Sequence, residues 1–395
     1  MRARGLVAAL SCAAFAFGCG GGGGSSPGGG AAVDNVQPIQ VSFGPADNLV
    51  NGLYTSVTIC APGTSNCQTI DGVQVDTGSV GLRLLASRVT VALPRMSDGA
   101  GNALANCASF ADNTYTWGPM ATADIRLAGE QASGVPIQLV GAPSFAAAPD
   151  DCSSGGTPAD TVSALSANGI LGLAVFRQDC GPACTAGRVP PFYFSCPPGS
   201  PCTEAAVPLQ RQLQNPVWLF PQDNNGMLVS LPSVPAGGAP TVAGSIVFGI
   251  GTQSNNALGG AHVYTTDDVG NFSTIFDGAT YTAYLDTGSN GLYFLDADTI
   301  PLPACPDPDS DFSCPPAPVS LRATTIGLNG TSASVSFDVA NAEQLFRTNN
   351  AALDDLAGPD SGDFDWGLPF FFGRPTFIGI EGQSSPGGPG PYWAY

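Results

Sequence analysis

Residues 75–85 read VDTGSVGLRLL, and residues 285–295 read LDTGSNGLYFL. Both stretches follow the pattern D-T-G-S-x-G-L-x-x-L, and each begins where an apolar, strand-like run ends in an aspartate. A carboxylate is costly to bury alone at such a place. The glycine lets backbone N–H groups approach the carboxylate, and the threonine and serine supply hydroxyl groups. The repeat therefore predicts two matching carboxylate sites in one chain.

The repetition extends beyond the two D-T-G strings. A hairpin-like segment leads into each aspartate, at residues 53–75 and again at residues 271–285. Each half later carries two apolar residues followed by a glycine, which we identify as Ile170-Leu171-Gly172 and Phe371-Phe372-Gly373. These features predict two similar lobes related by duplication.

Alternating and β-branched runs separated by turn residues dominate the rest of the chain. The strand-like runs are residues 39–44, 53–60, 70–78, 122–129, 134–141, 244–251, 279–288, 321–330 and 332–340. Helices are expected only at residues 203–214 and 340–347, and residues 234–240 (VPAGGAP) read as a hinge between the halves. The class is therefore all-β.

The composition excludes several kinds of chemistry. Hydrophobic residues make up 43% of the 395 residues and charged residues only 11%, which predicts a packed globular body. The chain has no lysine, so Schiff-base lysines, P-loops and Ser-Lys dyads are excluded. Its net charge of −19 would repel phosphate backbones, so no nucleic-acid partner is expected. His262 is the single histidine, which excludes multi-histidine zinc sites, and we expect it to be structural or exposed.

The N-terminus has the features of an export signal. Two arginines precede an apolar run at residues 6–17 that is too short to span a bilayer, so residues 1–18 are predicted to be a signal peptide. Residues 16–19 resemble a lipoprotein processing site, with Cys19 as the lipidated residue and residues 19–35 as a Gly-rich tether. The chain would then be an exported cell-envelope lipoprotein, at the outer membrane, that contacts membrane only through this anchor. The alternative is simple secretion.

Ten of the twelve cysteines lie beyond the N-terminal segment, an even number that suggests disulfides in an exported chain. Local spacing suggests the pairs Cys60–Cys67, Cys196–Cys202 and Cys305–Cys314. Cys180 could then pair with Cys184 and Cys107 with Cys152, although spacing alone does not fix the connectivity. A zinc site built from the four cysteines between residues 180 and 202 is the alternative for two of these pairs. The acidic run at residues 307–311 resembles the start of a calcium loop but lacks its glycine and its glutamate, so a solvated loop is expected instead.

The doubled D-T-G-S, with an apolar-apolar-Gly motif in each half, resembles the pepsin-like aspartic peptidases. The similarity covers roughly residues 36–380. It implies a bilobal fold of two duplicated β-barrel-like lobes, at residues 36–235 and 236–395, with a cleft between them. The chain also resembles a group of exported bacterial proteins that share the doubled D-T-G-S-x-G-L motif.

The resemblance implies a catalytic pair, Asp76 and Asp286. Two carboxyls at close range share a proton, so that one acts as a general base on a water and the other as an acid. In such a site Thr77 and Thr287 would brace the two loops across the seam. The remaining support residues would be Gly78, Ser79, Gly288 and Ser289. The expected protein is a monomeric endopeptidase for peptide or protein substrates, without cofactor or metal.

The family also carries a hairpin flap after the first motif, which we assign to residues 114–130. Trp117 and Gly118 stand where the family has Tyr-Gly, and Tyr115 lies two residues earlier on the same strand face. Arg83 replaces the family's usual tryptophan, and a cation–π contact between Arg83 and Trp117 is conceivable. The final residues, 384–395, read as a loose tail.

A non-enzymatic reading remains open. The same scaffold, with its catalytic function lost, would serve as a binding protein of the cell envelope. Both aspartates, both threonines and both serines are present, which favours the hydrolytic reading.

Overall fold

The computed structural model describes residues 34–143, 145–186, 192–295, 302–360 and 362–395. The predicted signal peptide, Cys19 and all but the last two residues of the tether lie outside these ranges. Within them, no helix combines the length and the apolar character needed to cross a bilayer.

A large sheet carries the first half of the chain and part of the second. Its strands are β1 (Val36–Ser42), β2 (Gly52–Cys60), β3 (Cys67–Asp76), β4 (Val80–Leu85), β5 (Ala103–Ser109), β6 (Thr114–Leu127), β7 (Glu130–Val140), β8 (Thr157–Pro158), β9 (Gly169–Leu173), β10 (Tyr193–Cys196), β11 (Thr203–Glu204), β12 (Gly226–Ser230), β13 (Val242–Phe248), β14 (Val263–Thr265), β22 (Thr376–Gly379) and β25 (Tyr392–Ala394). The hydrogen-bonded order is β11-β10-β5-β6-β7-β4-β9-β3-β2-β1-β13-β12-β22-β25-β14, and β8 pairs with β6.

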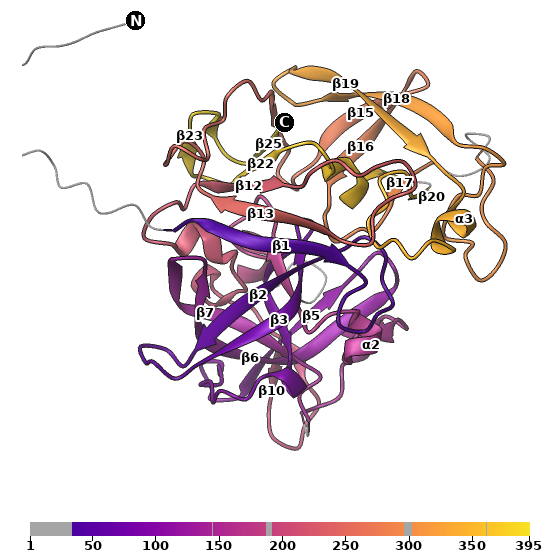
Figure 1. The fold of residues 1–395 in the computed structure, drawn as a ribbon. Coiled ribbons are helices and arrows are strands. Elements are labelled where there is room, and N and C mark those ends of the chain that lie inside the picture. The colour runs from indigo at the N-terminus through magenta and orange to yellow at the C-terminus, as the bar shows by residue number, and fades with distance from the viewer. Residues whose placement is uncertain (1–33, 144, 187–191, 296–301, 361) are drawn as a thin grey trace, which may run out of the picture. The chain divides into compact units, whose positions relative to one another are not determined.

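A second sheet belongs to the C-terminal half. Its order is β19-β18-β15-β16-β21-β17-β20. The bounds are β15 (Phe272–Phe276), β16 (Ala279–Leu285), β17 (Leu292–Phe294), β18 (Val319–Ile326), β19 (Ser332–Val339), β20 (Ala357–Gly358) and β21 (Phe364–Trp366), with β23 (Ser384–Ser385) and β24 (Gly388–Pro389) forming a separate pair. Figure 1 shows β1 between the strands of the first half, in indigo and magenta, and β12 and β13.

The sequence pattern explains why these strands form one core. In β1 the buried residues alternate with exposed ones, as expected for a strand with one face in the core. In β4 all six residues are buried, which fits a strand covered on both faces. Each fully buried aliphatic side chain contributes about 1.5–3 kcal/mol relative to exposure. The fold is all-β and bilobal, as the sequence predicted.

The segment predicted as a hinge, residues 234–240, lies in the loop that joins β12 to β13. These two strands pair antiparallel with each other, from Met227–Phe248 to Ser230–Ser245. The segment therefore turns a hairpin of the large sheet. The boundary between residues 235 and 236 stays a prediction.

One predicted helix is confirmed and the other is wrong. Residues 340–347 contain α3 (Ala342–Phe346), whose first turn is capped by the Asn341 side chain. Residues 203–214 instead contain β11 and a 3₁₀ turn at Leu209–Arg211 that follows Pro208. Proline lacks the N–H that a continuous helix needs at this point. Two further short helices are α1 (Asp150–Ser153) and α2 (Val162–Leu165).

The expectation of a loose tail at residues 384–395 is also wrong. Strand β25 pairs with β22 and with β14, and all three of its residues are buried. The Tyr395 ring stacks on Tyr264 at 4.6 Å between centroids. Aromatic side chains bury large areas, and this explains how a short Gly/Pro-rich segment is held in the sheet.

The five predicted disulfides are confirmed. They are Cys60–Cys67, Cys107–Cys152, Cys180–Cys184, Cys196–Cys202 and Cys305–Cys314. The four-cysteine zinc alternative is therefore wrong, because all its sulfur atoms are in disulfide bonds. The acidic run at residues 307–311 lies in the loop closed by Cys305–Cys314. Disulfides persist in oxidising compartments, so this set is typical of an exported protein.

Candidate active site

The first aspartate lies at the crossing of three strands. Strand β9 runs parallel to β3 and antiparallel to β4, so that Gly172 is paired with both Asp76 and Gly81. A Cβ atom at Gly172 would lie 2.6 Å from the Val80 nitrogen. Only glycine allows this approach of the strands, which explains the glycine of the Ile170-Leu171-Gly172 motif.

The second aspartate repeats this arrangement with β16, β17 and β21. Strand β21 runs parallel to β16, with Leu285 opposite Trp366, and the Asp286 N–H donates to Trp366 O at 3.1 Å. The residue that matches Gly172 is therefore Gly367, where a Cβ atom would lie 2.0 Å from Gly291 O.

The assignment of Phe371-Phe372-Gly373 as the second motif is accordingly wrong. The matching triplet is Asp365-Trp366-Gly367, and residues 368–371 form a 3₁₀ turn after it. The register between distant strands decides this point. The Phe-Phe-Gly string, six residues further on, fitted the apolar pattern better than a triplet that begins with an aspartate.

The threonines link the two loops across the seam. Thr77 Oγ1 donates to Leu285 O at 3.0 Å, and Thr287 Oγ1 donates to Val75 O at 2.8 Å. Each hydroxyl also accepts the backbone N–H of the other threonine, at 2.9 and 3.1 Å. Both threonines are buried. This reciprocal set of four hydrogen bonds fixes the position of one aspartate relative to the other.

The carboxyls of Asp76 and Asp286 meet over the two D-T-G glycines. The Gly78 N–H donates to Asp76 Oδ1 at 2.7 Å and to Asp286 Oδ1 at 3.0 Å, and the Gly288 N–H donates to Asp286 Oδ1 at 2.7 Å. A Cβ atom at Gly78 would lie 2.7 Å from Asp286 Cγ. The two carboxyls are also within hydrogen-bonding reach of each other.

The serines bind the outer carboxyl oxygens. Ser79 Oγ donates to Asp76 Oδ2, and Ser289 Oγ donates to Asp286 Oδ2 at 2.8 Å. Asp76 is buried, Asp286 is partly buried, and Gly78 between them is exposed. The paired carboxyls thus lie at the protein surface, with their outer oxygens covered by hydroxyl groups.

Burial and the neighbouring Asp76 carboxyl raise the pKa of Asp286 well above its usual range. The Ser289 hydroxyl and the Gly288 N–H lower it, but these effects are smaller. Two close carboxyls cannot both ionise easily, so the pair retains a proton at pH values where an isolated aspartate has lost it.

The predicted flap has a different structure. Residues 114–130 are not a hairpin, because β6 runs through Trp117 without turning. This strand leaves β5 at Pro119 and joins β7 at Met120. A Cβ atom at Gly118 would lie 2.0 Å from Leu139 O, so close packing between strands explains this glycine.

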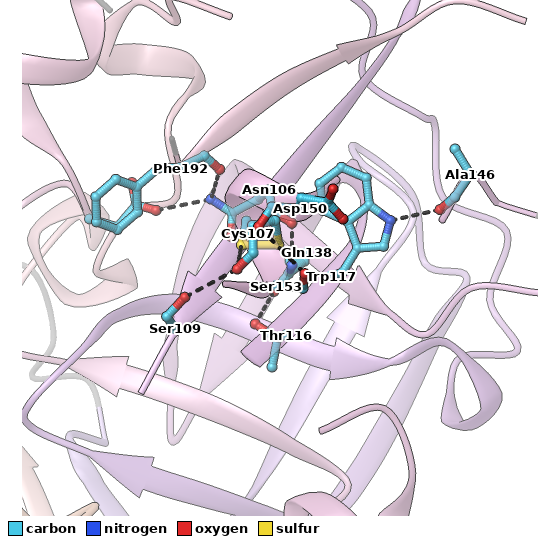
Figure 2. Close-up of a disulfide and its surroundings, with 12 residues drawn as sticks. Asn106, Cys107, Ser109, Thr116, Trp117, Gln138, Ala146, Asp150, Ser153 and Phe192 are labelled. Atoms are coloured by element: carbon cyan, nitrogen blue, oxygen red, sulfur yellow. Dashed lines mark hydrogen bonds between the residues drawn. A yellow bond between two sulfur atoms is a disulfide. The ribbon is translucent and has the colours of Figure 1, made fainter. Parts of the chain in front are cut away.

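Figure 2 shows Trp117 beside the Cys107–Cys152 disulfide, with its ring nitrogen donating to Ala146 O at 2.7 Å. The ring also packs against Phe194, and Tyr115 packs at the edge of the same cluster. None of the described contacts of Trp117, Gly118 or Tyr115 reaches the aspartate pair. Their role in substrate binding stays a prediction.

The cation–π contact considered between Arg83 and Trp117 is not formed, because Arg83 is paired with Asp179 instead. The Arg83 side chain is buried and its Nη2 lies 3.7 Å from Asp179 Oδ2. Tyr193 and Asn106 donate to the same carboxyl. Burial raises the pKa of Asp179 to about 6, although Arg83 and Tyr193 oppose the shift. A buried guanidinium requires such a partner, and Asp179 is too far along the chain for sequence spacing to indicate it.

A family model described as a protein of unknown function (DUF3443) matches residues 31–395. The chain belongs to the DUF3443 family. No curated protein matches the sequence.

Among the solved structures that this DUF3443 protein is similar to is an aspartic proteinase from Irpex lacteus. The TM-score is 0.51 and the identity 14%, over 87% of this chain and 94% of that one. At this identity the similarity concerns the fold, and it supports a pepsin-like bilobal architecture for this chain.

Besides Gly367, sequence reasoning missed Asp365. It occupies the place of Ile170 in the other half, and its side chain is buried at 4% exposure. The only sequence signal was a charged residue between Phe364 and Trp366, inside an apolar stretch.

Proposed function

We propose that this protein is an aspartic endopeptidase in which Asp76 and Asp286 activate one water to attack a peptide carbonyl. The observation that carries the proposal is the shared contact at Gly78, whose N–H donates to a carboxyl oxygen of each aspartate. The similarity in fold to an aspartic proteinase agrees with it.

The raised pKa of Asp286 favours Asp286 as the member that carries the proton. Asp76 then acts as the general base that takes a proton from the water, while Asp286 donates its proton to the carbonyl oxygen. When the C–N bond breaks, Asp76 gives its proton to the leaving amine and Asp286 takes a proton back from a hydroxyl of the tetrahedral intermediate, which restores the pair. No covalent intermediate with the protein is needed.

The supporting residues have distinct tasks in this proposal. Thr77 and Thr287 keep the two loops in register, and Gly78 and Gly288 allow the carboxyls to approach. Ser79 and Ser289 hold the outer oxygens, so that the inner oxygens face the water and the substrate.

The substrate would be an extended peptide or an unfolded protein, bound partly through its backbone groups. The proposed setting is the cell envelope, where the monomeric protein would be held by a lipid on Cys19 or released by simple secretion.

The test is cleavage of an unfolded protein at about pH 3 to 6, where a carboxyl pair holds one proton. Asp76→Asn and Asp286→Asn should each abolish cleavage, and a transition-state inhibitor of aspartic peptidases should block the wild type. Asp277→Asn is the matched control, because Asp277 is an exposed turn residue.

Two outcomes would overturn the proposal. Activity that survives both substitutions would exclude the pair as the catalytic group. Wild-type protein without cleavage across this range would favour a non-catalytic binding protein on the same scaffold.

A further inference from the structure

A third carboxyl group lies next to the aspartate pair. Asp365 is the middle residue of β21, where it is paired with Tyr284 of β16 and Tyr293 of β17. Its chain neighbours Phe364 and Trp366 are fully buried. A carboxyl is expensive to place in such apolar surroundings unless it is neutral or well paired.

The partners of Asp365 are few. The Ser289 hydroxyl is near enough to the carboxyl to lower its pKa, whereas Asp365 Oδ1 is buried and has no hydrogen-bond partner among the described residues. No described cation forms an ion pair with it; the two ion pairs of the described chain involve Arg83 and Arg347.

The charges around Asp365 also oppose its ionisation. Burial raises the pKa of Asp365 well above its usual range, repulsion from Asp286, Asp360 and Asp76 adds to this, and the Ser289 hydroxyl opposes it. Tyr284 and Tyr293 are paired with Asp365 on the neighbouring strands, and after burial this carboxyl is among the charges that raise the pKa of both phenols.

We propose that Asp365 is a positioning residue of the paired-aspartate site, which stays protonated and donates to Ser289 Oγ while Ser289 donates to Asp286 Oδ2. This inference rests on the proposed peptidase function. A hydroxyl that accepts from Asp365 must point its own hydrogen elsewhere, and Asp286 Oδ2 lies 2.8 Å away. Hydrogen bonds in such a chain polarise and strengthen one another.

The other half of the site has no such residue. Ile170 occupies the matching position, so the Ser79 hydroxyl is held by Asp76 alone. When the pH rises enough to ionise Asp365, the Ser289 hydroxyl turns toward the new charge and Asp286 loses its donor. Asp365 therefore sets the alkaline limit of the site.

Two substitutions separate the hydrogen bond from the charge. Asp365→Asn keeps an N–H donor for Ser289 and removes the ionisation, whereas Asp365→Leu removes both and restores the apolar character found at Ile170. Asp365→Leu should lower kcat about tenfold with KM unchanged, the effect of one lost hydrogen bond in the transition state. Asp365→Asn should keep kcat and move the alkaline limb of the kcat profile upward by about one pH unit or more. Wild-type kcat and pH profile in both variants would overturn the inference.

A second measurement does not depend on activity. At neutral pH the infrared spectrum should contain the carbonyl stretch of a protonated carboxyl that is lost in Asp365→Asn and kept in the control Asp277→Asn. An unchanged band in Asp365→Asn would overturn the inference even for an active enzyme. If the wild type cleaves nothing but the band is lost, the peptidase proposal fails while the protonated Asp365 stands.

Discussion

The two halves of the site have the same arrangement of strands, but they differ in the side chains next to each aspartate. Behind Asp76, the pair of neighbours on β4 and β9 is Arg83 and Ile170; behind Asp286, the corresponding pair on β17 and β21 is Tyr293 and Asp365. The first half therefore holds a buried cation and the second a buried acid. The strands and threonines are the same in both halves, although the buried Arg83 has a counter-charge in Asp179 and the buried Asp365 has no described cation beside it.

The largest expected difference in stability between the two halves comes from the buried ion pair of the first half. Asp179→Ala leaves the Arg83 guanidinium without a counter-charge in the interior, which should lower the free energy of unfolding by about 3–5 kcal/mol. Tyr293→Phe, at the place that matches Arg83, removes only a hydroxyl that donates to Asn290 and should cost about 1 kcal/mol. Urea unfolding of both variants checks this. Equal losses would contradict the assigned difference between the halves.

The two glycines should behave alike, which tests the symmetry directly. In Gly78→Ala and Gly288→Ala, the new methyl group would meet the carboxyl of the opposite aspartate at 2.7 and 2.8 Å. Under the proposed function, displacing either carboxyl by a fraction of an ångström to one ångström should lower kcat about a hundredfold. Gly99→Ala, where the methyl group would enter open space, is the control for peptide cleavage assays. Full activity in either site variant would disprove the close approach.

Removing the hydroxyl of Thr77 or of Thr287 should destabilise the protein by nearly the same amount. Thr77→Val or Thr287→Val removes one hydroxyl that both donates and accepts across the seam, and leaves buried backbone groups unpaired. Each variant should lose about 1–3 kcal/mol of unfolding free energy. Thermal unfolding measures this loss, and Thr64→Val is the control because Thr64 is an exposed turn residue. A loss of stability in only one of the two variants would show that the two threonines do not contribute equally to holding the loops together.

The smallest expected effect is the pH dependence of stability. The pKa of Asp286 is raised in the folded state, so its ionisation penalises folding; the wild type should lose stability as pH rises from about 4 through the folded-state value. Asp286→Asn lacks this loss, so its melting temperature relative to wild type should increase with pH. A difference that stays constant from acid to neutral pH would show that Asp286 titrates normally.

The sequence was most informative where the signal is local. The D-T-G-S strings, the β class and four of the five disulfides depend on residues close together in the chain, and each was predictable; Cys107–Cys152, 45 residues apart, was predicted as well. Gly367 and Asp179 were not, because strand register and buried ion pairing bring together residues that are distant in sequence. The same limitation applied to β25, whose aromatic residues were visible but whose pairing with β22 and β14 was not.

The disulfides bear on how this protein matures. Each described cysteine is joined to the next described cysteine in the chain, at separations of 7, 45, 4, 6 and 9 residues. An oxidant that joins thiols in the order in which they leave an export channel would make the native set directly. The described cysteines then need no disulfide isomerisation, and none of these five bonds links the two halves of the chain.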